Sequence, residues 1–226
     1  MRLRFILLVT LVTILALATT AYAAPSLASI TTGTPERCNG STGTNFVIAE
    51  GGNITPMNIS GDAQTDAWQG FYGEITGQII LGDNSCDKMY DWSLVNLSGE
   101  VYLSVNNAVA WAAIAGQQVC TVDEGLTGTG SDRVNRTFTN NTLAGWDVGG
   151  TPINGACQTY TYVNNASQNV SFEEIILNDG TTQYIYATKI NADTAGFDGN
   201  THDYQIIVPD NTSTQTTTYY VYVEFN

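Results

Sequence analysis

The chain has 226 residues, of which 7 are Lys or Arg and 21 are Asp or Glu, so its formal net charge is −14. This balance excludes a sequence-independent nucleic-acid binder, because such a protein needs a surplus of basic side chains to displace counterions. The hydrophobic content of 43% excludes a wholly disordered chain. A sequence rich in Thr, Tyr, Val, Gly and Asn and poor in Lys is typical of strands and turns.

Residues 1–23 have the pattern of a secretory signal peptide. Arg2 and Arg4 form a basic start, an apolar run follows, and Ala21-Tyr22-Ala23 is an A-x-A cleavage site. The run has about 14 residues, whereas a helix that crosses a bilayer needs roughly 20, so cleavage is favoured over an uncleaved anchor. We therefore expect an extracellular or cell-surface protein without a transmembrane anchor. Loss of the two arginines leaves five basic residues and a net charge of −16.

The mature chain begins with a segment that lacks strand periodicity. Residues 24–45 contain Pro25 and Pro35 among many Thr, Ser and Gly residues, and they predict an extended N-terminal arm. From residue 46 onward, alternation of apolar and polar positions dominates. We expect one all-β domain over residues 46–226, a β-sandwich or jelly roll with long surface loops.

Strands are expected at short intervals, with turn sequences between them. The longest candidate covers residues 67–81, where Gly73 and Gly77 predict bulges or a bend between sheets. The last strand, residues 219–225, places Tyr219 and every second residue after it on one face. The other candidates are residues 90–94, 101–105, 159–162, 170–177, 184–190 and 204–208.

Two segments interrupt this strand pattern. Residues 106–118 are Ala-rich and fit either a short helix or a strand. Residues 123–145 are rich in Gly, Thr and Asn, and they predict a long surface excursion.

The exported chain keeps four cysteines, Cys38, Cys86, Cys120 and Cys157. An even number in an oxidising setting favours two disulfides. Four cysteines allow three connectivities, and Cys38–Cys86 with Cys120–Cys157 is our working hypothesis. Zinc is disfavoured, because the sequence has no C-x-x-C spacing and its one histidine is distant from the cysteines.

The acceptor pattern for N-glycosylation, Asn-x-Ser/Thr, occurs nine times. With 20 Asn residues in the mature chain, about four matches would arise by chance. The excess predicts a coat of covalent glycans, although Asn and Thr are also common in turns and strands. The acceptors are Asn39, Asn53, Asn58, Asn96, Asn135, Asn140, Asn165, Asn169 and Asn211.

One acidic segment concentrates oxygen ligands: Asp193, Asp198, Asn200 and Asp203. Calcium takes six to eight oxygens, but the spacing is not that of an EF-hand. Asp and Asn also cap backbone groups in polar turns, and we expect that role here, with calcium as the alternative and no other cofactor or metal. His202 lies in the same segment, where we expect a surface or capping role.

Catalytic patterns are weak. A Ser-His-Asp triad would have to use His202, yet the sequence has no G-x-S-x-G elbow. Glycosidases need two carboxyl groups about 5–10 Å apart across a cleft. The adjacent pairs Asp123-Glu124 and Glu173-Glu174 do not indicate this, and on a strand Glu173 and Glu174 would point to opposite faces. We therefore expect a protein that is not an enzyme.

The four tryptophans, Trp68, Trp92, Trp111 and Trp146, together with 12 tyrosines, could form a face on which sugars stack. Aromatic residues inside or beside alternating strands more often pack in the core, and we expect this for Trp68 and Trp92. A carbohydrate-binding or adhesion module is therefore the alternative to a structural role.

Three aromatic and glycine-rich signatures occur together. They are WQGFYG at residues 68–73, GFDG at 196–199 followed by DYQIIVP at 203–209, and TYYVYVE at 218–224. Together they resemble a group of mostly uncharacterised, secreted archaeal surface proteins, over most of residues 53–226. The resemblance implies a shared fold and brings no catalytic residues.

The profile is also similar to archaeal extracellular filament subunits, which are exported, glycosylated β-sandwiches joined by donor-strand complementation. An extended segment of one subunit there completes the sheet of the next, since an unpaired sheet edge binds a strand through main-chain hydrogen bonds. The resemblance implies that residues 24–35 are such a donor strand, with Leu27 and Ile30 as apolar anchors, unless this N-terminus is disordered. The expected partners are further copies of the chain, in a filament or surface layer.

Overall fold

The computed structural model describes residues 24–38, 46–60, 62–93, 97–127, 130–139, 145–166, 170–181, 183–210 and 216–226. Within them the chain is all-β, as the sequence predicts, and every strand pair is antiparallel. The expected signal peptide, residues 1–23, lies outside the described residues. None of the described helices has the length and apolarity that crossing a membrane requires.

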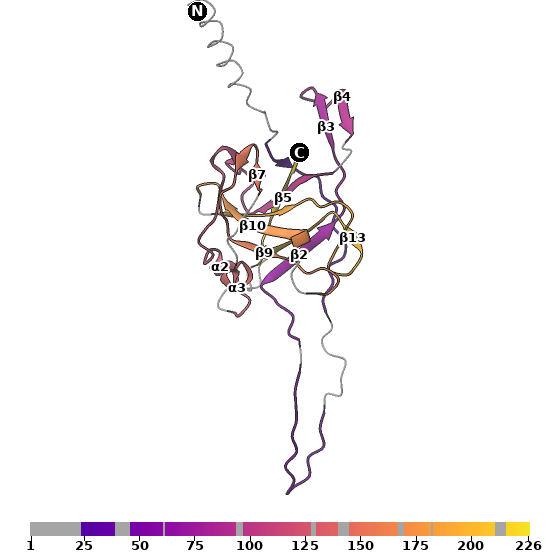
Figure 1. Cartoon of the computed structure of the whole chain (residues 1–226), viewed down its shortest axis with the longest axis vertical. Coiled ribbons are helices and arrows are strands. Elements are labelled where there is room, and N and C mark those ends of the chain that lie inside the picture. The colour runs from indigo at the N-terminus through magenta and orange to yellow at the C-terminus, as the bar shows by residue number, and fades with distance from the viewer. Residues whose placement is uncertain are drawn as a thin grey trace, which may run out of the picture.

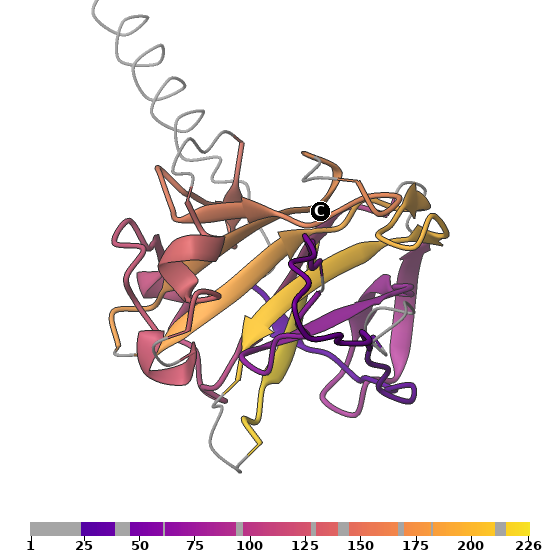
Figure 2. The same ribbon diagram turned by 90° about the horizontal axis from the view of Figure 1, so that it is seen from below.

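A seven-stranded sheet forms the centre of the molecule (Figures 1 and 2). Its strands run in the order β1 (Ser26–Leu27), β15 (Tyr220–Phe225), β5 (Gly99–Ser104), β11 (Tyr184–Lys189), β10 (Glu173–Asn178) and β6 (Ala115–Gly116), and β9 (Gln158–Tyr160) also pairs with β10. Gly99 opens β5 with φ 133°, and a Cβ atom there would collide with the carbonyl oxygen of Glu224. Only glycine lets β5 approach β15 in this way.

Both faces of this sheet are buried. One face is covered by a second sheet, β14 (Tyr204–Pro209) with β2 (Trp68–Gly73), and the other by the hairpin of β7 (Asp147–Val148) and β8 (Thr151–Pro152) with the short 3-10 helix Trp111–Ala113. Successive strand residues point to opposite faces, so Val101 and Tyr102 enter different cores. The molecule is therefore a β-sandwich with a further layer of loops.

Several expectations about the strands are confirmed. The bend within residues 67–81 separates β2, which pairs with β14, from β3 (Gln78–Gly82), which pairs with β4 (Lys88–Ser93) in another sheet. Tyr219 and every second residue after it pack against one core. The Ala-rich segment contains the 3-10 helix and then β6, so it is helical in one part and a strand in another.

The expected surface excursion at 123–145 is wrong in part. Its described residues form two short helical turns, α2 (Glu124–Thr127) and α3 (Val134–Thr137). Val134 and Phe138 are spaced four apart, share one side of that turn and are fully buried. The ring of Phe138 lies 5.9 Å from that of Tyr186 and 6.1 Å from that of Trp68, so this segment closes one end of the core.

Two segments project from opposite ends of the body (Figure 1). One is residues 46–60, here called the tail, whose two extended limbs meet at a turn where the Asn53 amide donates to the Glu50 carbonyl (3.4 Å). The other is the β3–β4 hairpin. We predict that the domain starts at residue 46. The described residues 46–60 and 62–66 belong to no sheet, and the next strand after β1 is β2. An ion pair between Arg37 and Asp66 (2.5 Å) links the parts of the chain that precede and follow the tail.

Candidate functional site

The edge of β15 is where the expected donor strand meets the body. Ser26 pairs with Val223 and Leu27 with Tyr222, and the Ala28 amide donates to the Val221 carbonyl at 2.9 Å. The arm thus binds the edge through main-chain hydrogen bonds, as strand addition requires. The strand that it contributes has two residues, whereas β15 has six.

The apolar anchors expected on the arm are not buried in this single chain. Leu27 is 63% exposed and Ile30 is 58% exposed. Leu27 lies in β1, and Ile30 lies beyond the paired residues. The backbone of the arm is therefore docked on its own sheet, while both anchor side chains face away from the core.

Among the described residues of the arm, 24–38, Pro25 is the one that is buried. It lies against Gly149, whose φ of 56° turns the β7–β8 hairpin so that its amide donates to both Glu224 carboxylate oxygens (2.9 and 3.0 Å). Tyr102 donates its hydroxyl to the same carboxylate (2.9 Å). Proline has no N–H to offer a neighbouring strand, which makes it suited to a sheet edge.

Two buried glutamates lie beside this edge. Glu100 and Glu224 are directly opposite each other on β5 and β15, and both are buried. On the other neighbour of β5, the strand β11, Lys189 is opposite Glu100. Burial, followed by the charge of Glu224, raises the pKa of Glu100 to about 7. Burial also raises the pKa of Glu224, although the hydrogen bonds that it accepts oppose this. Both groups are covered by protein, so this pair has no access to a polymeric substrate.

The cysteine hypothesis holds for one pair. Cys120 and Cys157 form a disulfide, with their Cα atoms 5.5 Å apart. The pairing of Cys38 with Cys86 is not formed, and both thiols are free and exposed. Cys38 lies in the arm and Cys86 lies in the turn of the β3–β4 hairpin, so the fold holds them on separate segments.

The glycan acceptors fall into two groups. Of the described ones, Asn53 and Asn58 are exposed in the tail, Asn165 is exposed in a turn, and Asn135 is half-buried in α3. The remaining acceptors, Asn39, Asn96, Asn140, Asn169 and Asn211, lie outside the described residues. Glycosylation of any of them stays a prediction.

Of the four calcium candidates, Asp193 and Asp203 come together, whereas Asp198 and Asn200 bond to each other at a separate turn. Asp203 is buried, and its carboxylate accepts the amides of Asp193 (3.0 Å) and Ile75 (2.7 Å). Asp198 instead accepts from Asn200, at the turn between β12 (Thr194–Ala195) and β13 (Thr201–His202). The carboxylates of Glu74, Asp193 and Asp203 approach one another, but both carboxylate oxygens of Asp203 already accept backbone amides.

His202 is not at the surface. It is buried, its Nε2 lies 3.0 Å from the Asp198 carboxylate, and its ring stacks with that of Phe197 at 6.2 Å. We predict a surface or capping role for His202, and the surface position is wrong, because β13 carries this residue inward.

Glu173 and Glu174 point to opposite faces of β10, as predicted. Glu173 accepts from the Trp146 indole (2.8 Å) and pairs with Lys189 (3.1 Å). Glu174 accepts the Ile207 amide (2.9 Å) on the other face, and its complete burial raises its pKa well above the usual range. Asp123 accepts the Tyr186 hydroxyl (2.9 Å), and burial raises its pKa as well.

The tryptophans divide into packed and exposed residues. Trp146 is buried, and Trp68 and Trp111 pack against the two cores. Trp92 is half exposed, so the expectation of core packing is wrong for it. Its ring lies 4.9 Å from that of Tyr90 on the same hairpin, with 61° between the ring planes.

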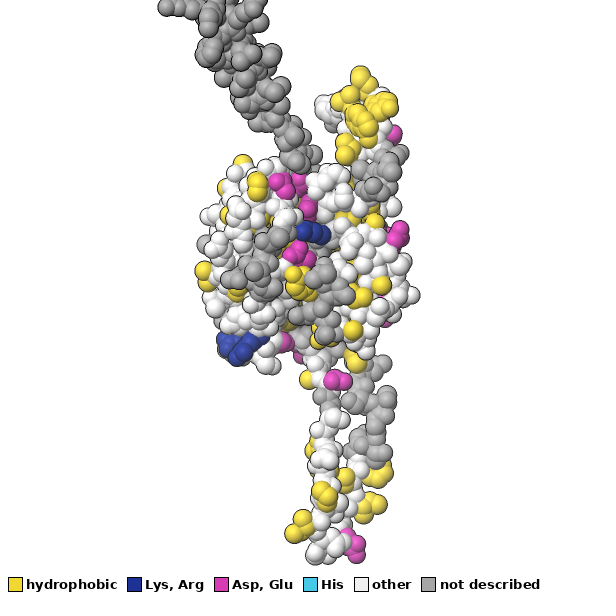
Figure 3. Space-filling view, viewed as in Figure 1, with side chains coloured by type: hydrophobic (Ala, Val, Ile, Leu, Met, Phe, Trp, Pro, Cys, Tyr) yellow, Lys and Arg dark blue, Asp and Glu magenta, His cyan; other side chains and the backbone are white. Residues whose placement is uncertain are grey.

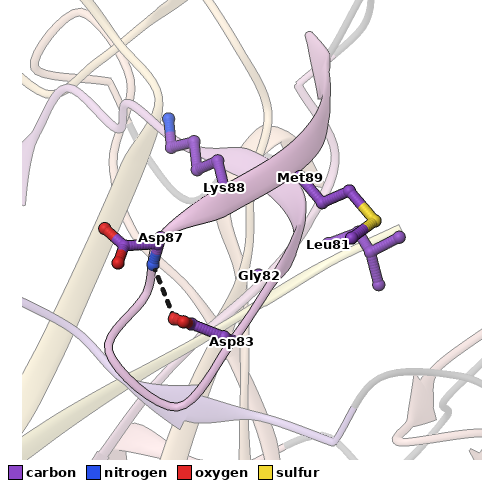
Figure 4. A pocket seen from close by; sticks show the side chains of 6 residues that line it. All are labelled: Leu81, Gly82, Asp83, Asp87, Lys88 and Met89. Carbon is purple, nitrogen blue, oxygen red and sulfur yellow. Dashed lines mark hydrogen bonds between the residues drawn. The ribbon is translucent and has the colours of Figure 1, made fainter.

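A depression at the turn of the β3–β4 hairpin is lined by Leu81, Gly82, Asp83, Asp87, Lys88 and Met89 (Figure 4). The Asp83 carboxylate accepts the Asp87 amide (2.9 Å) and so shapes the turn. Leu81 and Met89 point to one side of the strands and Lys88 to the other (Figure 4). The depression is shallow and solvent-facing, and the Asp83 carboxylate in it already accepts the amides of Ser85 and Asp87 (both 2.9 Å).

Comparison of the chain with family models, with curated proteins and with solved structures found no match. The described residues define an antiparallel β-sandwich that carries the short strand β1 on the edge of β15, with the tail and the β3–β4 hairpin projecting from the body.

Proposed function

We propose that the chain is a secreted structural subunit of an archaeal extracellular filament or surface layer, and that its copies assemble by β-strand donation. The observation that carries this proposal is the pairing of the N-terminal arm with the edge of β15. The arm recognises that edge through backbone atoms, and backbone pairing is the interaction that a donated strand uses.

In the assembled state, the arm of one copy takes the edge of β15 in the next copy. The pairing of β1 with β15 that forms within one chain can also form between two chains, because every copy has the same arm and the same β15 edge. Two features of the single chain favour this exchange. The strand β1 pairs with only two of the six residues of β15, and the apolar side chains of Leu27 and Ile30 remain exposed. An exchange that does not close on itself builds a fibre.

Deletion of residues 24–35 tests this proposal. We expect the truncated protein to be secreted or refolded as a soluble, folded molecule that forms no fibres, because the deleted segment contributes one two-residue strand and leaves both cores intact. Negative-stain microscopy of the purified protein, beside the unmodified chain, is the measurement.

A synthetic peptide with the sequence of residues 24–35 provides the control. It should bind the truncated protein at the vacated edge, whereas a peptide with proline at positions 26 and 28 should not, because it lacks the required amide donors. Fibres that persist unchanged after the deletion would contradict strand donation by this arm.

The alternative, a carbohydrate-binding or adhesion module, is favoured by one observation, the exposed pair Tyr90 and Trp92. Their rings meet edge to face, with 61° between the planes, so they do not form the flat platform on which a sugar ring stacks. A glycan array without a saturable ligand would remove this alternative.

A further inference from the structure

The β3–β4 hairpin has one wholly apolar face that nothing in the described chain covers. Ile79 is opposite Trp92 and Leu81 is opposite Tyr90, and residues directly opposite in an antiparallel pair share a face. These four side chains are between 42% and 59% exposed. A two-stranded hairpin alone in water is marginally stable, so such a face indicates a missing partner.

The tail is the second uncovered apolar element. Its large apolar side chains are between 58% and 101% exposed. They are Phe46, Val47, Ile48, Ile54, Met57 and Ile59. Its two limbs are extended but form no strand ladder with each other, so their backbone groups are open to pairing.

Both surfaces are depleted of charge in a strongly acidic protein. Residues 46–60 contain one charged side chain, Glu50, at the turn. On the hairpin, Lys88 lies 3.6 Å from Asp91 on the face opposite to Trp92. Depletion of charge, with exposed aromatic and Met side chains, is typical of the centre of a protein–protein interface. Burying the two surfaces against each other would desolvate no ion pair.

The positions of the two elements identify the partner. They lie at opposite ends of the long axis of the molecule, with the β-sandwich between them, and the apolar side chains gather at both ends (Figures 1 and 3). One copy therefore cannot bring its own tail to its own hairpin, whereas a second copy placed end to end can.

We infer that the apolar face of the β3–β4 hairpin binds the tail of a second copy of this chain. Met57 and Ile59 of one limb pack on the face of Tyr90 and Trp92, and the extended limb lies along the hairpin. Asn58 points away from that contact, because side chains alternate along an extended strand, so a glycan there is compatible with it. This inference rests on the proposed function, and it supplies a second, head-to-tail contact between neighbouring subunits.

The contact is small, so it is weak on its own and becomes effective when arm exchange holds the same two copies together. Stable interfaces bury on the order of 1,200–2,000 Å², more than four hairpin side chains provide. Two linked weak contacts reinforce each other through effective concentration. The truncated protein without residues 24–35 should therefore remain free of fibres but still show reversible association at high concentration.

Sedimentation velocity of the truncated protein over a range of concentrations tests the inference. The double variant Tyr90→Ser/Trp92→Ser lacks the hairpin surface, and Met57→Ser/Ile59→Ser lacks the tail surface. Each alone should weaken self-association at least about tenfold, because each removes two anchors from the contact. A 1:1 mixture should recover association but stop at the heterodimer, since one intact hairpin and one intact tail remain.

The matched control is Ile80→Ser, on the opposite face of the same hairpin, which should associate as the truncated protein does. Thermal melting of every variant shows that the body is intact. Equal association of all variants, or a mixture that behaves as its components do, would overturn the inference. So would concentration-independent monomers that bind lipid vesicles or glycans through the same side chains. These results leave the arm-deletion experiment unaffected, so failure of either proposal can be recognised separately.

Discussion

Replacing Cys120 and Cys157 together by serine is expected to lower the free energy of unfolding by about 4 kcal/mol. The two residues are 37 apart in sequence, and cross-linking a loop of that length removes this amount of chain entropy from the unfolded state. Cys157 is also fully buried in the core, where serine would place a hydroxyl. Denaturant titration of the variant and of the unmodified protein gives the difference.

The double substitution Cys38→Ser/Cys86→Ser is the matched control. Both thiols are exposed and unpaired, so the free energy of unfolding should change by no more than about 0.5 kcal/mol. Reducing agent should destabilise this control as strongly as it does the unmodified chain. A large loss of stability in the control, comparable to that of the Cys120 and Cys157 variant, would show that a second disulfide forms.

Glu100→Gln should stabilise the protein at pH 8 by on the order of 3 kcal/mol and have little effect at pH 4. Burial and the facing Glu224 raise the pKa of Glu100 from an ordinary 4.5 to about 7, so the folded state holds its proton more tightly than the unfolded state does. The stabilisation from protonated Glu100 is complete below pH 4.5 and is lost as the pH rises through about 7. Glutamine keeps the acceptor for Asn226 and does not ionise.

Unfolding free energies measured from pH 4 to pH 8 should therefore fall with pH in the unmodified chain and fall less in the variant. Glu36→Gln, at an exposed position on the arm, is the control, and as a surface substitution it should change the free energy of unfolding by no more than about 0.5 kcal/mol. Parallel profiles for Glu100→Gln and the unmodified chain would show that Glu100 ionises normally.

The sequence predicts the fold well where strand periodicity meets a buried sheet. The alternation in residues 219–225 marks the two faces of β15, and the glycines of residues 67–81 mark the change of sheet between β2 and β3. Alternation identifies the faces of a strand but does not show whether anything covers them. The hairpin face with Tyr90 and Trp92 has the same pattern as a core strand, yet it projects beyond the body.

Other features depend on contacts between segments far apart in sequence. Val134 and Phe138 lie in a Gly- and Asn-rich segment that suggests a loop, but they fill the end of the core beside Tyr186. The facing of Glu100 and Glu224 depends on the register of β5 and β15, which are over a hundred residues apart. In the sequence, Glu100 and Glu224 each stand out only as a single carboxylate within an alternating strand. The free state of Cys38 and Cys86 also depends on where the fold places each segment.

Strand exchange through the edge of β15 is tested most directly by a covalent trap. Ser26 and Val223 are opposite in β1 and β15, and Cα atoms at such positions lie about 5.5 Å apart or less, within the range for a disulfide. Ser26→Cys/Val223→Cys, in a chain with Cys38→Ser/Cys86→Ser, is oxidised after assembly and separated on a denaturing gel without reductant. Strand donation predicts a ladder of covalent multimers that collapses to one band on reduction. A single monomeric band from assembled material would show that the arm stays on its own chain, and would contradict the proposal.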